Sequence, residues 1–258
     1  MRFCSLGSGS TGNAWLVEAG TTRVLIDCGI GPDRLTVRLL RAGVDAGSID
    51  AILVTHEHDD HVGGAAAFAR RHSIPVHATY GTVQGSGAAL SGVDRLLELE
   101  PSGRVVIGDI EVLPVAVPHD AREPVQYVLG DGVVRLGVIT DLGSITPHVT
   151  ASFSGLDALV LEANHDEDML HQGPYPKFLK ERVGGRYGHL SNAVAARLLG
   201  AVAGERLQHV VAAHLSLKNN TALLARSAFA AALGCAGDWI AVATEDGLDW
   251  REITPIRG

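Results

Sequence analysis

The hydrophobic and polar residues of this chain follow two different patterns, which predict two kinds of element. Short apolar runs, rich in valine, isoleucine and leucine and bounded by glycine or aspartate, predict strands and hairpins. In the first half of the chain these runs cover 2–6, 13–19, 22–28, 51–56, 105–117 and 125–140. The Gly-Asp-Gly sequence at 130–132 predicts a hairpin turn inside the last run.

Segments with helical spacing of their apolar residues interrupt the strands. We expect helices over 33–42, 62–72, 191–203 and 219–233. Further strand-like runs lie beside the later helices and cover 157–163, 209–215 and 239–244. No linker rich in proline or serine divides the chain, so we expect a single domain over residues 1–258. Interleaved strands and helices predict an α/β fold in four layers, with two sheets inside and helices outside.

Composition narrows the class of protein. A hydrophobic fraction of 46% is enough for a substantial core, yet no apolar run approaches the roughly 20 residues of a membrane span. The first 13 residues lack the features of a signal peptide, and three distant cysteines indicate neither a disulfide framework nor a cysteine-based zinc site. We therefore expect a cytoplasmic protein without membrane contact. The net charge of −8 disfavours nucleic-acid binding through the whole surface, although a local basic patch could still bind it.

One glycine-rich segment imitates a nucleotide-binding motif. Gly7, Gly9 and Gly12 of "GSGSTG" follow a predicted strand with the spacing G-x-G-x-x-G. That motif requires its last glycine to open a helix, whereas the residues after Gly12 continue as a predicted hairpin. The segment also lacks the lysine of a phosphate-binding P-loop. We therefore expect no nucleotide cofactor.

The sequence "HEHDDH" at 56–61 places three of the 12 histidines between a predicted strand and a predicted helix. Loops at strand ends commonly carry catalytic groups. His56 and His58 are two positions apart in extended chain and point the same way, so both can bind one metal ion. Asp60 and His61 follow at the start of the helix and face a neighbouring point, which can hold a second ion. Imidazoles with a carboxylate suit Zn²⁺, Mn²⁺ or Fe²⁺; the alternative is a solvated polar turn.

This H-x-H-x-D-H pattern resembles the metal motif of the metallo-β-lactamase fold superfamily. The resemblance implies an αββα sandwich of two mixed sheets, with the site at the edge where the sheets meet. It also implies three later ligands, and His119, Asp141 and His214 occur in the required order at predicted strand ends. One ion would be bound by His56, His58, His119 and Asp141. The other would be bound by Asp60, His61, Asp141 and His214.

Two acids are candidates for orienting these ligands, and the metals imply the chemistry. Asp27 resembles the buried aspartate behind the histidine loop of the superfamily, and Asp59 is a second candidate, because a metal-binding histidine commonly donates its other N–H to a carboxylate. Two ions roughly 3.5–4 Å apart can share a hydroxide that attacks the substrate. We therefore expect a dinuclear hydrolase with two divalent ions, Zn²⁺ or Mn²⁺, and Fe²⁺ as the alternative.

Four further stretches bear on the substrate. "GSGSTGN", "LEANHD", "GHLSN" and "HLSLKNN" occur in this order and as a set resemble the YycJ/WalJ-type branch of bacterial exonucleases. The resemblance covers residues 2 to about 220 and implies a phosphodiesterase that acts on DNA. His189 could hold a phosphate oxygen or protonate the leaving group, and Ser191 or Asn192 could cap a helix whose N–H groups favour phosphate. Asp60 and His189 are the candidate catalytic residues.

Other residues are candidates for substrate contacts. Lys177, Lys180, Arg182 and Arg186 against Glu181 give residues 177–186 a charge of 4 − 1 = +3. Such a stretch would follow a phosphodiester backbone, or it is an ordinary solvated helix face. The remaining candidates are Ser10, Asn13 and His165. The first two lie in a loop that glycines alone could shape, and the third lies in a turn that Asn164 or Asp166 could cap.

The expected function is therefore a DNA exonuclease, with small-molecule hydrolysis as the alternative. A cyclic phosphodiesterase, a glyoxalase II-type thioesterase and a lactonase of the same fold share the hexapeptide and the bridging aspartate. A catalytically silent module generally loses ligands, and all seven are present. The interval between Asp141 and His214 is 214 − 141 = 73 positions, which leaves no room for a separate cap domain. The grip on DNA would come from the surface itself or from a partner subunit in a homo-oligomer.

Overall fold

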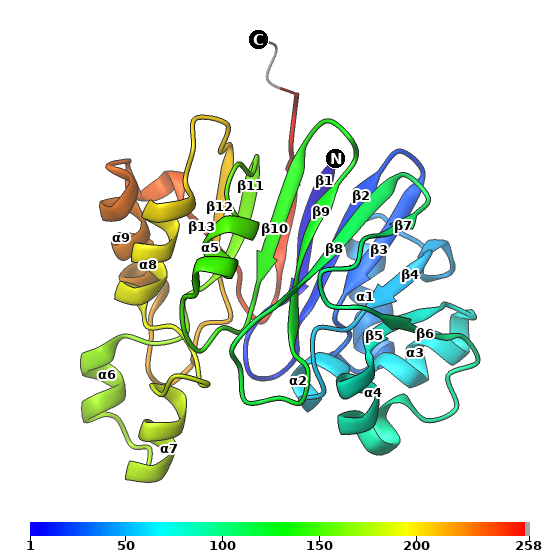
Figure 1. Ribbon diagram of the computed structural model, residues 1–258, viewed down its shortest axis with the longest axis horizontal. Coiled ribbons are helices and arrows are strands. Elements are labelled where there is room, and N and C mark those ends of the chain that lie inside the picture. The colour runs from blue at the N-terminus through cyan, green and yellow to red at the C-terminus, as the bar shows by residue number, and fades with distance from the viewer. Residues whose placement is uncertain (256–258) are drawn as a thin grey trace.

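Two sheets of seven strands each face each other across an apolar core (Figure 1). They contain the predicted strands together with three that were not predicted, at 76–79, 96–99 and 248–252. The structure, a computed structural model, describes residues 1–255. The first sheet contains, in spatial order, β14 (Leu248–Glu252), β1 (Arg2–Gly7), β2 (Ala14–Ala19), β3 (Thr22–Ile26), β4 (Ala51–Leu53), β5 (Val76–Thr79) and β6 (Leu96–Leu99). The second contains β13 (Ala241–Val242), β12 (His209–Ala213), β11 (Ala158–Glu162), β10 (Arg135–Ile139), β9 (Val125–Gly130), β8 (Ile110–Ala116) and β7 (Val105–Ile107).

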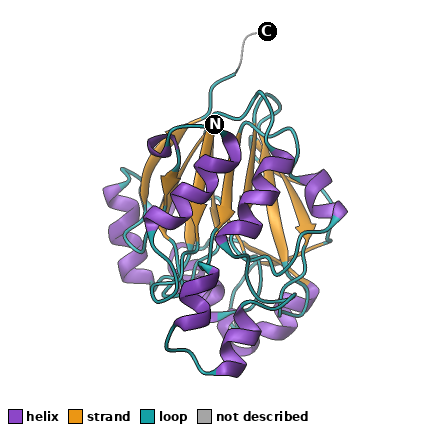
Figure 2. Ribbon diagram, turned by 90° about the vertical axis from the view of Figure 1, so that its left-hand side faces the viewer, coloured by secondary structure: helices purple, strands orange, loops and turns teal. Residues whose placement is uncertain are grey.

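Helices cover the outer faces of both sheets (Figure 2). The helices that pack against the first sheet are α1 (Pro32–Arg41), α2 (Asp59–Val62), α3 (Ala65–His72) and α4 (Tyr80–Ser86), and those against the second are α5 (Pro147–Ser152), α8 (Asn192–Val202) and α9 (Ala222–Leu233). Helices α6 (Glu167–Gln172) and α7 (Lys177–Val183) lie below the sheets in Figure 1. Strand β2 shows why the sheets need cover on both sides. Trp15 and Val17 point between the sheets, whereas Leu16 points outward to the cluster that contains Leu35 of α1 and Phe68 of α3. The predicted four-layer α/β fold is confirmed.

Both sheets are built in the same way, and this places the functional site. Each joins antiparallel hairpins to a run of four parallel strands, β3 to β6 in the first sheet and β10 to β13 in the second. The carboxyl ends of parallel strands lie at one edge of a sheet, where ligands commonly bind. The segments that follow β3, β4, β10, β11 and β12 therefore gather at the lower edge in Figure 1.

Several predicted boundaries are wrong, each for a local reason. The run 51–56 is a strand only to Leu53, because the backbone N–H of Thr55 donates to the Asp27 carboxylate rather than to a neighbouring strand. The helix expected over 62–72 is two helices, α2 and α3, separated at 63–64. A side chain at Gly64 would collide with the carbonyl oxygen of Ile30, so the turn after β3 packs directly against this break.

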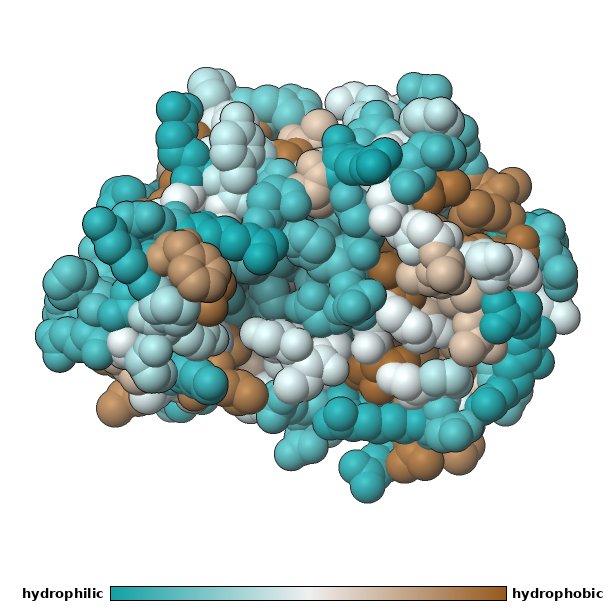
Figure 3. Space-filling view, turned by 90° about the horizontal axis from the view of Figure 1, so that it is seen from below, coloured by the Kyte–Doolittle hydropathy of each residue, from teal (hydrophilic) through white to brown (hydrophobic). Residues whose placement is uncertain are grey.

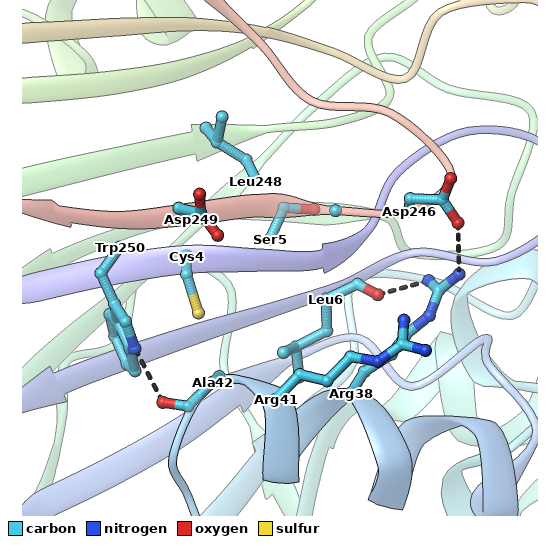
Figure 4. A pocket seen from close by; sticks show the side chains of 11 residues that line it. Cys4, Ser5, Leu6, Arg38, Arg41, Ala42, Asp246, Leu248, Asp249 and Trp250 are labelled. Atoms are coloured by element: carbon cyan, nitrogen blue, oxygen red, sulfur yellow. Dashed lines mark hydrogen bonds and ion pairs between the residues drawn. The ribbon is translucent and has the colours of Figure 1, made fainter.

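Strand β14 ties the far end of the described chain to its beginning. It pairs antiparallel with β1, with Arg2 opposite Glu252. Figure 4 shows the contact of both strands with α1 around a cavity of about 330 Å³. There the Trp250 indole donates to the carbonyl oxygen of Ala42 at 2.9 Å, and Arg38, which is 7% exposed, donates to the carbonyl oxygen of Leu6. Among residues 1–255, no helix combines the length and apolar character needed to cross a bilayer.

Candidate metal centre

The seven predicted ligands meet at the lower edge of the two sheets, where His58, Asp60, Asp141 and His214 line a cleft. The cleft has a volume of about 320 Å³ and lies among polar side chains on the face seen in Figure 3. His56 and His58 follow β4, Asp60 and His61 belong to α2, and the other three ligands follow β8, β10 and β12. The parallel strands β4, β10 and β12 therefore end at one edge, and β8 ends there too, because β8 and β10 are both antiparallel to β9.

One group of ligands has the spacing that a single ion requires. His56 Nε2 lies 3.0 Å from His58 Nδ1, and His119 Nε2 lies 3.3 Å from the same atom. Two nitrogens bound to one tetrahedral zinc ion at about 2.0–2.1 Å would lie about 3.3 Å apart. Asp141 Oδ1 is 3.8 Å from His119 Nε2 and completes the predicted set.

The second predicted group converges in the same way. His61 Nε2 lies 3.0 Å from Asp141 Oδ2 and 3.5 Å from Asp60 Oδ2. The Asp60 oxygen is in turn 3.4 Å from His214 Nε2. Asp141 therefore stands between the two groups: its Oδ2 faces His61, and its Oδ1 lies 3.8 Å from His119 Nε2 and 3.2 Å from His214 Nδ1.

Most of these imidazoles are oriented by a hydrogen-bond partner at the ring nitrogen that faces away from the cleft. The Nδ1 partners are Thr55 Oγ1 for His56 (2.9 Å), Asp27 Oδ2 for His61 (2.7 Å), the carbonyl oxygen of Gly188 for His119 (3.0 Å) and that of Thr140 for His214 (2.8 Å). A donor bond at Nδ1 fixes the tautomer and leaves Nε2 free to bind a metal.

The donor set fits divalent cations. Asp141 Oδ2 and His214 Nε2 are buried and make no hydrogen bond, a costly arrangement that a metal ion would relieve. Burial lowers the pKa of His56, which keeps this imidazole in the neutral, metal-binding form. Burial opposes a charge on His61 as well, but the Asp141 and Asp27 carboxylates raise its pKa well above the usual value. Metal binding is therefore expected to displace protons from the second group.

Asp27 is the buried aspartate that the sequence predicts, and its backbone is unusual. Its carboxylate accepts from the backbone N–H and the hydroxyl of Thr55 on one oxygen and from His61 on the other. Both Asp27 (φ 62°) and His214 (φ 52°) lie in the left-handed region, which residues other than glycine rarely adopt. Conformations of this kind cluster at functional sites.

Replacing Asp27 with asparagine is expected to weaken binding of the more weakly held metal about 10–100-fold, a usual effect of removing an outer partner of a ligand. An amide nitrogen that faces His61 Nδ1 would oppose its N–H and disturb the ring. Competition against a chelating dye measures the affinity. The thermal midpoint of the metal-free variant separates a loss of metal affinity from general destabilisation. Unchanged affinities for both metals would contradict the role of Asp27 in orienting His61.

Sequence reasoning missed Glu162, the last residue of β11, which is fully buried behind His189. Its Oε1 lies 2.6 Å from His189 Nδ1, and its Oε2 accepts from the backbone N–H groups of Leu142 and Leu190 at 3.0 Å each. Burial lowers the pKa of His189, but the Glu162 carboxylate outweighs this and raises it. The available signal was a charged residue at the end of an otherwise apolar strand.

The candidate substrate residues fall into three groups. Ser10, Arg182 and His189 line the metal cleft. A second hollow of about 370 Å³, lined by His165, Lys180 and Ser191, adjoins the cleft at His189. Neither hollow is lined by Asn13, Asn192, Lys177 or Arg186.

Several of these side chains have structural partners. Asn13 bonds to the backbone of Gly9 and Asp60, and Asn192 bonds to Asn220, so both side chains hold loops together. Ser191 caps α8 as predicted, by accepting from the backbone N–H of Val194 at 3.2 Å.

Asp59 and the basic stretch lie toward solvent. Asp59 is exposed, and within the described residues its side chain makes no hydrogen bond to a ligand histidine. The four basic residues belong to α7 and the turn after it. Arg182 pairs with Asp120 at 2.6 Å, and Lys180 donates to the carbonyl oxygen of His171 at 2.6 Å.

Comparisons with known proteins agree with this geometry. A family model described as "Beta-lactamase superfamily domain" matches residues 22–214. The chain is 34% identical to "Exodeoxyribonuclease YycJ" of Bacillus anthracis, over 88% of this chain and 86% of that protein. It is 31% identical to "Exodeoxyribonuclease WalJ" of Streptococcus pneumoniae, over 87% of this chain and 85% of that protein. The resemblance predicted from the motifs is thus confirmed.

A solved structure of low sequence identity shows the fold. The metallo-β-lactamase fold protein YhfI from Bacillus subtilis superposes with a TM-score of 0.77, at 15% identity, over 97% of this chain and 99% of that one. The predicted αββα sandwich of two mixed sheets is therefore confirmed.

Proposed function

This chain belongs to the beta-lactamase superfamily and is a metal-dependent hydrolase, and from that premise we propose that it is a dinuclear phosphodiesterase that removes nucleotides from the ends of DNA. The observation that carries the proposal is the position of α7. Its Leu179, Arg182 and Val183 line the same cleft as His58, Asp60 and Asp141. The basic helix α7, which would bind an anionic polymer, and the candidate metal centre, which would hydrolyse it, thus share one cleft. The names of the two exodeoxyribonuclease relatives support DNA as the substrate.

The seven ligands would hold two divalent ions, of which Zn²⁺ or Mn²⁺ are the expected kinds and Fe²⁺ is the alternative. Such ions generate a hydroxide nucleophile at neutral pH and stabilise negative charge on the attacked phosphate. Asp60, about a quarter exposed, faces the cleft from α2 and would contribute the carboxylate of the second site.

His189 and Glu162 would act together on the leaving group. The carboxylate accepts from Nδ1 and favours the imidazolium, which leaves Nε2–H available to donate a proton to the departing oxygen. Proton transfer of this kind contributes typically about 10²–10⁴-fold to a rate. Glu162 itself is anchored by two backbone N–H groups, so the pair is rigid.

Small-molecule hydrolysis remains the runner-up, and charge separates the two functions. A lactone or thioester has no need of a basic helix, whereas each phosphate contact made by lysine or arginine strengthens DNA binding in a salt-dependent way. Lys177, Lys180 and Arg186 are suited to test this, because Arg182 pairs with Asp120, which lines the metal cleft, whereas Lys177 pairs with the exposed Glu181 and Lys180 bonds a backbone carbonyl.

Metal-reconstituted protein is expected to shorten end-labelled DNA stepwise, and chelation to abolish the reaction. Changing Lys177, Lys180 and Arg186 to glutamate should lower kcat/KM for DNA about tenfold or more at moderate salt. The matched control changes Arg34, Arg95 and Arg197 to glutamate; these exposed residues lie outside both hollows, and we expect less than about a threefold effect. Turnover of a thioester or lactone without any DNA cleavage would reject the proposal.

A further inference from the structure

Two aromatic residues next in sequence to residues that line the metal cleft, Leu179 and Gly188, have rings largely open to solvent. Phe178 of α7 is 71% exposed, and Tyr187, in the turn after α7, is 63% exposed. A single exposed apolar residue needs no explanation. Phe178 and Tyr187 are nine positions apart, lie beside the site and are among the most exposed large hydrophobic side chains of the described chain. Together they need an explanation.

The backbone holds both rings beside the cleft. Phe178 and Arg182 are four positions apart on one helix and therefore share a face, and Arg182 lines the cleft. Tyr187 precedes Gly188, whose carbonyl oxygen orients His119 at 3.0 Å. The backbone around Tyr187 also packs on Gly143, where any side chain would collide with it. The position of Tyr187 therefore cannot move far without disturbing the centre.

Positive charges alternate with these rings along the chain. Residues 177–187 read "KFLKERVGGRY", so lysines flank Phe178 and Arg186 precedes Tyr187. A third ring, Tyr175, has the Lys218 ammonium 5.7 Å from its centroid. Rings combined with cations are the features that bind single strands, because bases stack on the rings while the cations follow the phosphates.

Charge and space decide which occupant fits. A second copy of this chain carries a net charge of −8, and an apolar partner would gain nothing from the basic residues, whereas a DNA strand matches both the charge and the rings. The cleft, at about 320 Å³, is at the small end of ligand pockets, a size that suits the end of one strand. Because Leu179, Arg182 and Val183 of α7 line it, the following nucleotides would pass along this helix.

We propose that Phe178 and Tyr187 stack on unpaired bases of the DNA strand whose end occupies the cleft. The inference rests on the proposed exonuclease function and deepens it. In this arrangement the rings bind the bases, the basic residues bind the phosphates, and the cleft holds the scissile bond. The protein would consequently handle a strand end in its unpaired form, whether it is supplied single-stranded or is frayed from a duplex.

The test compares normal single-stranded DNA with the same strand made abasic at the nucleotides next to the cleaved end. The metal-loaded wild-type protein is expected to prefer normal DNA in kcat/KM. Phe178→Ala and Tyr187→Ala should each reduce this preference about tenfold, in line with the stacking energy per base. Leu223→Ala, at an equally exposed residue of α9, is the matched control and should keep the preference. The wild-type protein should quench the fluorescence of 2-aminopurine placed at the nucleotides next to the cleaved end. This quenching should disappear in the variant that carries both Phe178→Ala and Tyr187→Ala.

Each other result overturns the inference in a recognisable way. If both variants keep the wild-type preference, the rings do not stack on bases, although exonuclease activity stands. An equal loss on normal and abasic DNA would mean that the rings only support the fold or the backbone contacts. If wild-type protein forms a dimer in sedimentation that the double variant cannot form, the rings bind a second copy. No cleavage of any DNA would remove the proposed function and this inference together.

Discussion

Replacing Asp60 with alanine is expected to reduce phosphodiester hydrolysis at least about 10³-fold, which corresponds to about 4 kcal/mol of transition-state stabilisation. The carboxylate is the only acidic ligand that the second predicted site does not share with the first, and its Oδ2 lies within 3.5 Å of both His61 Nε2 and His214 Nε2. Two imidazoles and a shared aspartate would hold the second ion poorly.

The folded state should survive this change. The Asp60 side chain is 25% exposed, and its close neighbours within the described residues are the candidate ligands His61 and His214 and the amide of Asn13 at 3.5 Å. Asp59→Ala, at the neighbouring exposed acid, is the control and should retain activity within about threefold, since an exposed polar residue without partners contributes little. Elemental analysis should find about one metal per chain in Asp60→Ala and two in the control. Wild-type rates with two metals in Asp60→Ala would contradict the dinuclear mechanism.

His189→Ala and Glu162→Gln are expected to lower the rate of DNA cleavage by about 10²–10⁴-fold, the range for loss of a general acid. Alanine removes the proton donor. Glutamine keeps an oxygen for the backbone N–H groups of Leu142 and Leu190 but turns an amide N–H toward His189 Nδ1. The neutral ring would then accept at Nδ1, and the imidazolium would no longer be favoured.

A variant with both His189→Ala and Glu162→Gln shows whether the two residues act as one unit or contribute separately. If Glu162 acts through His189, adding Glu162→Gln to His189→Ala should cost little more, because residues that act as a unit are strongly non-additive. Cleavage of a substrate with a p-nitrophenolate leaving group, which needs no protonation, should fall much less than cleavage of DNA. Loss of a metal in His189→Ala would instead identify His189 as a ligand, and additive losses would separate the two roles.

The layers and the first group of candidate ligands could be predicted because both depend on local signals. His56 to His61 lie within six residues, between a strand-like run and a helix-like run. His119, Asp141 and His214 were implied by the resemblance to the superfamily, and each follows an apolar run typical of a strand. Parallel strands then bring their ends to one edge whatever the intervening loops do.

The remaining features depend on neighbours distant in sequence. Glu162 becomes significant only when β11 lies beside β10 and the 188–190 turn, which no spacing along the chain reveals. The helices α4, α5 and α6 are only six or seven residues long, too short for periodicity to identify. Asn13 was a candidate for substrate contact, yet its amide is committed to the backbone of Gly9 and Asp60.

The pairing of β1 with β14 has a consequence for how the chain is made. About 240 residues separate the two strands, so at 5–20 residues per second a ribosome would deliver β14 roughly 12–50 s after β1. During that interval the outer edge of β1 has no partner, and open strand edges are the usual starting points of misassembly. A nascent chain stalled before residue 248 would therefore present this edge, and we expect chaperones to act there.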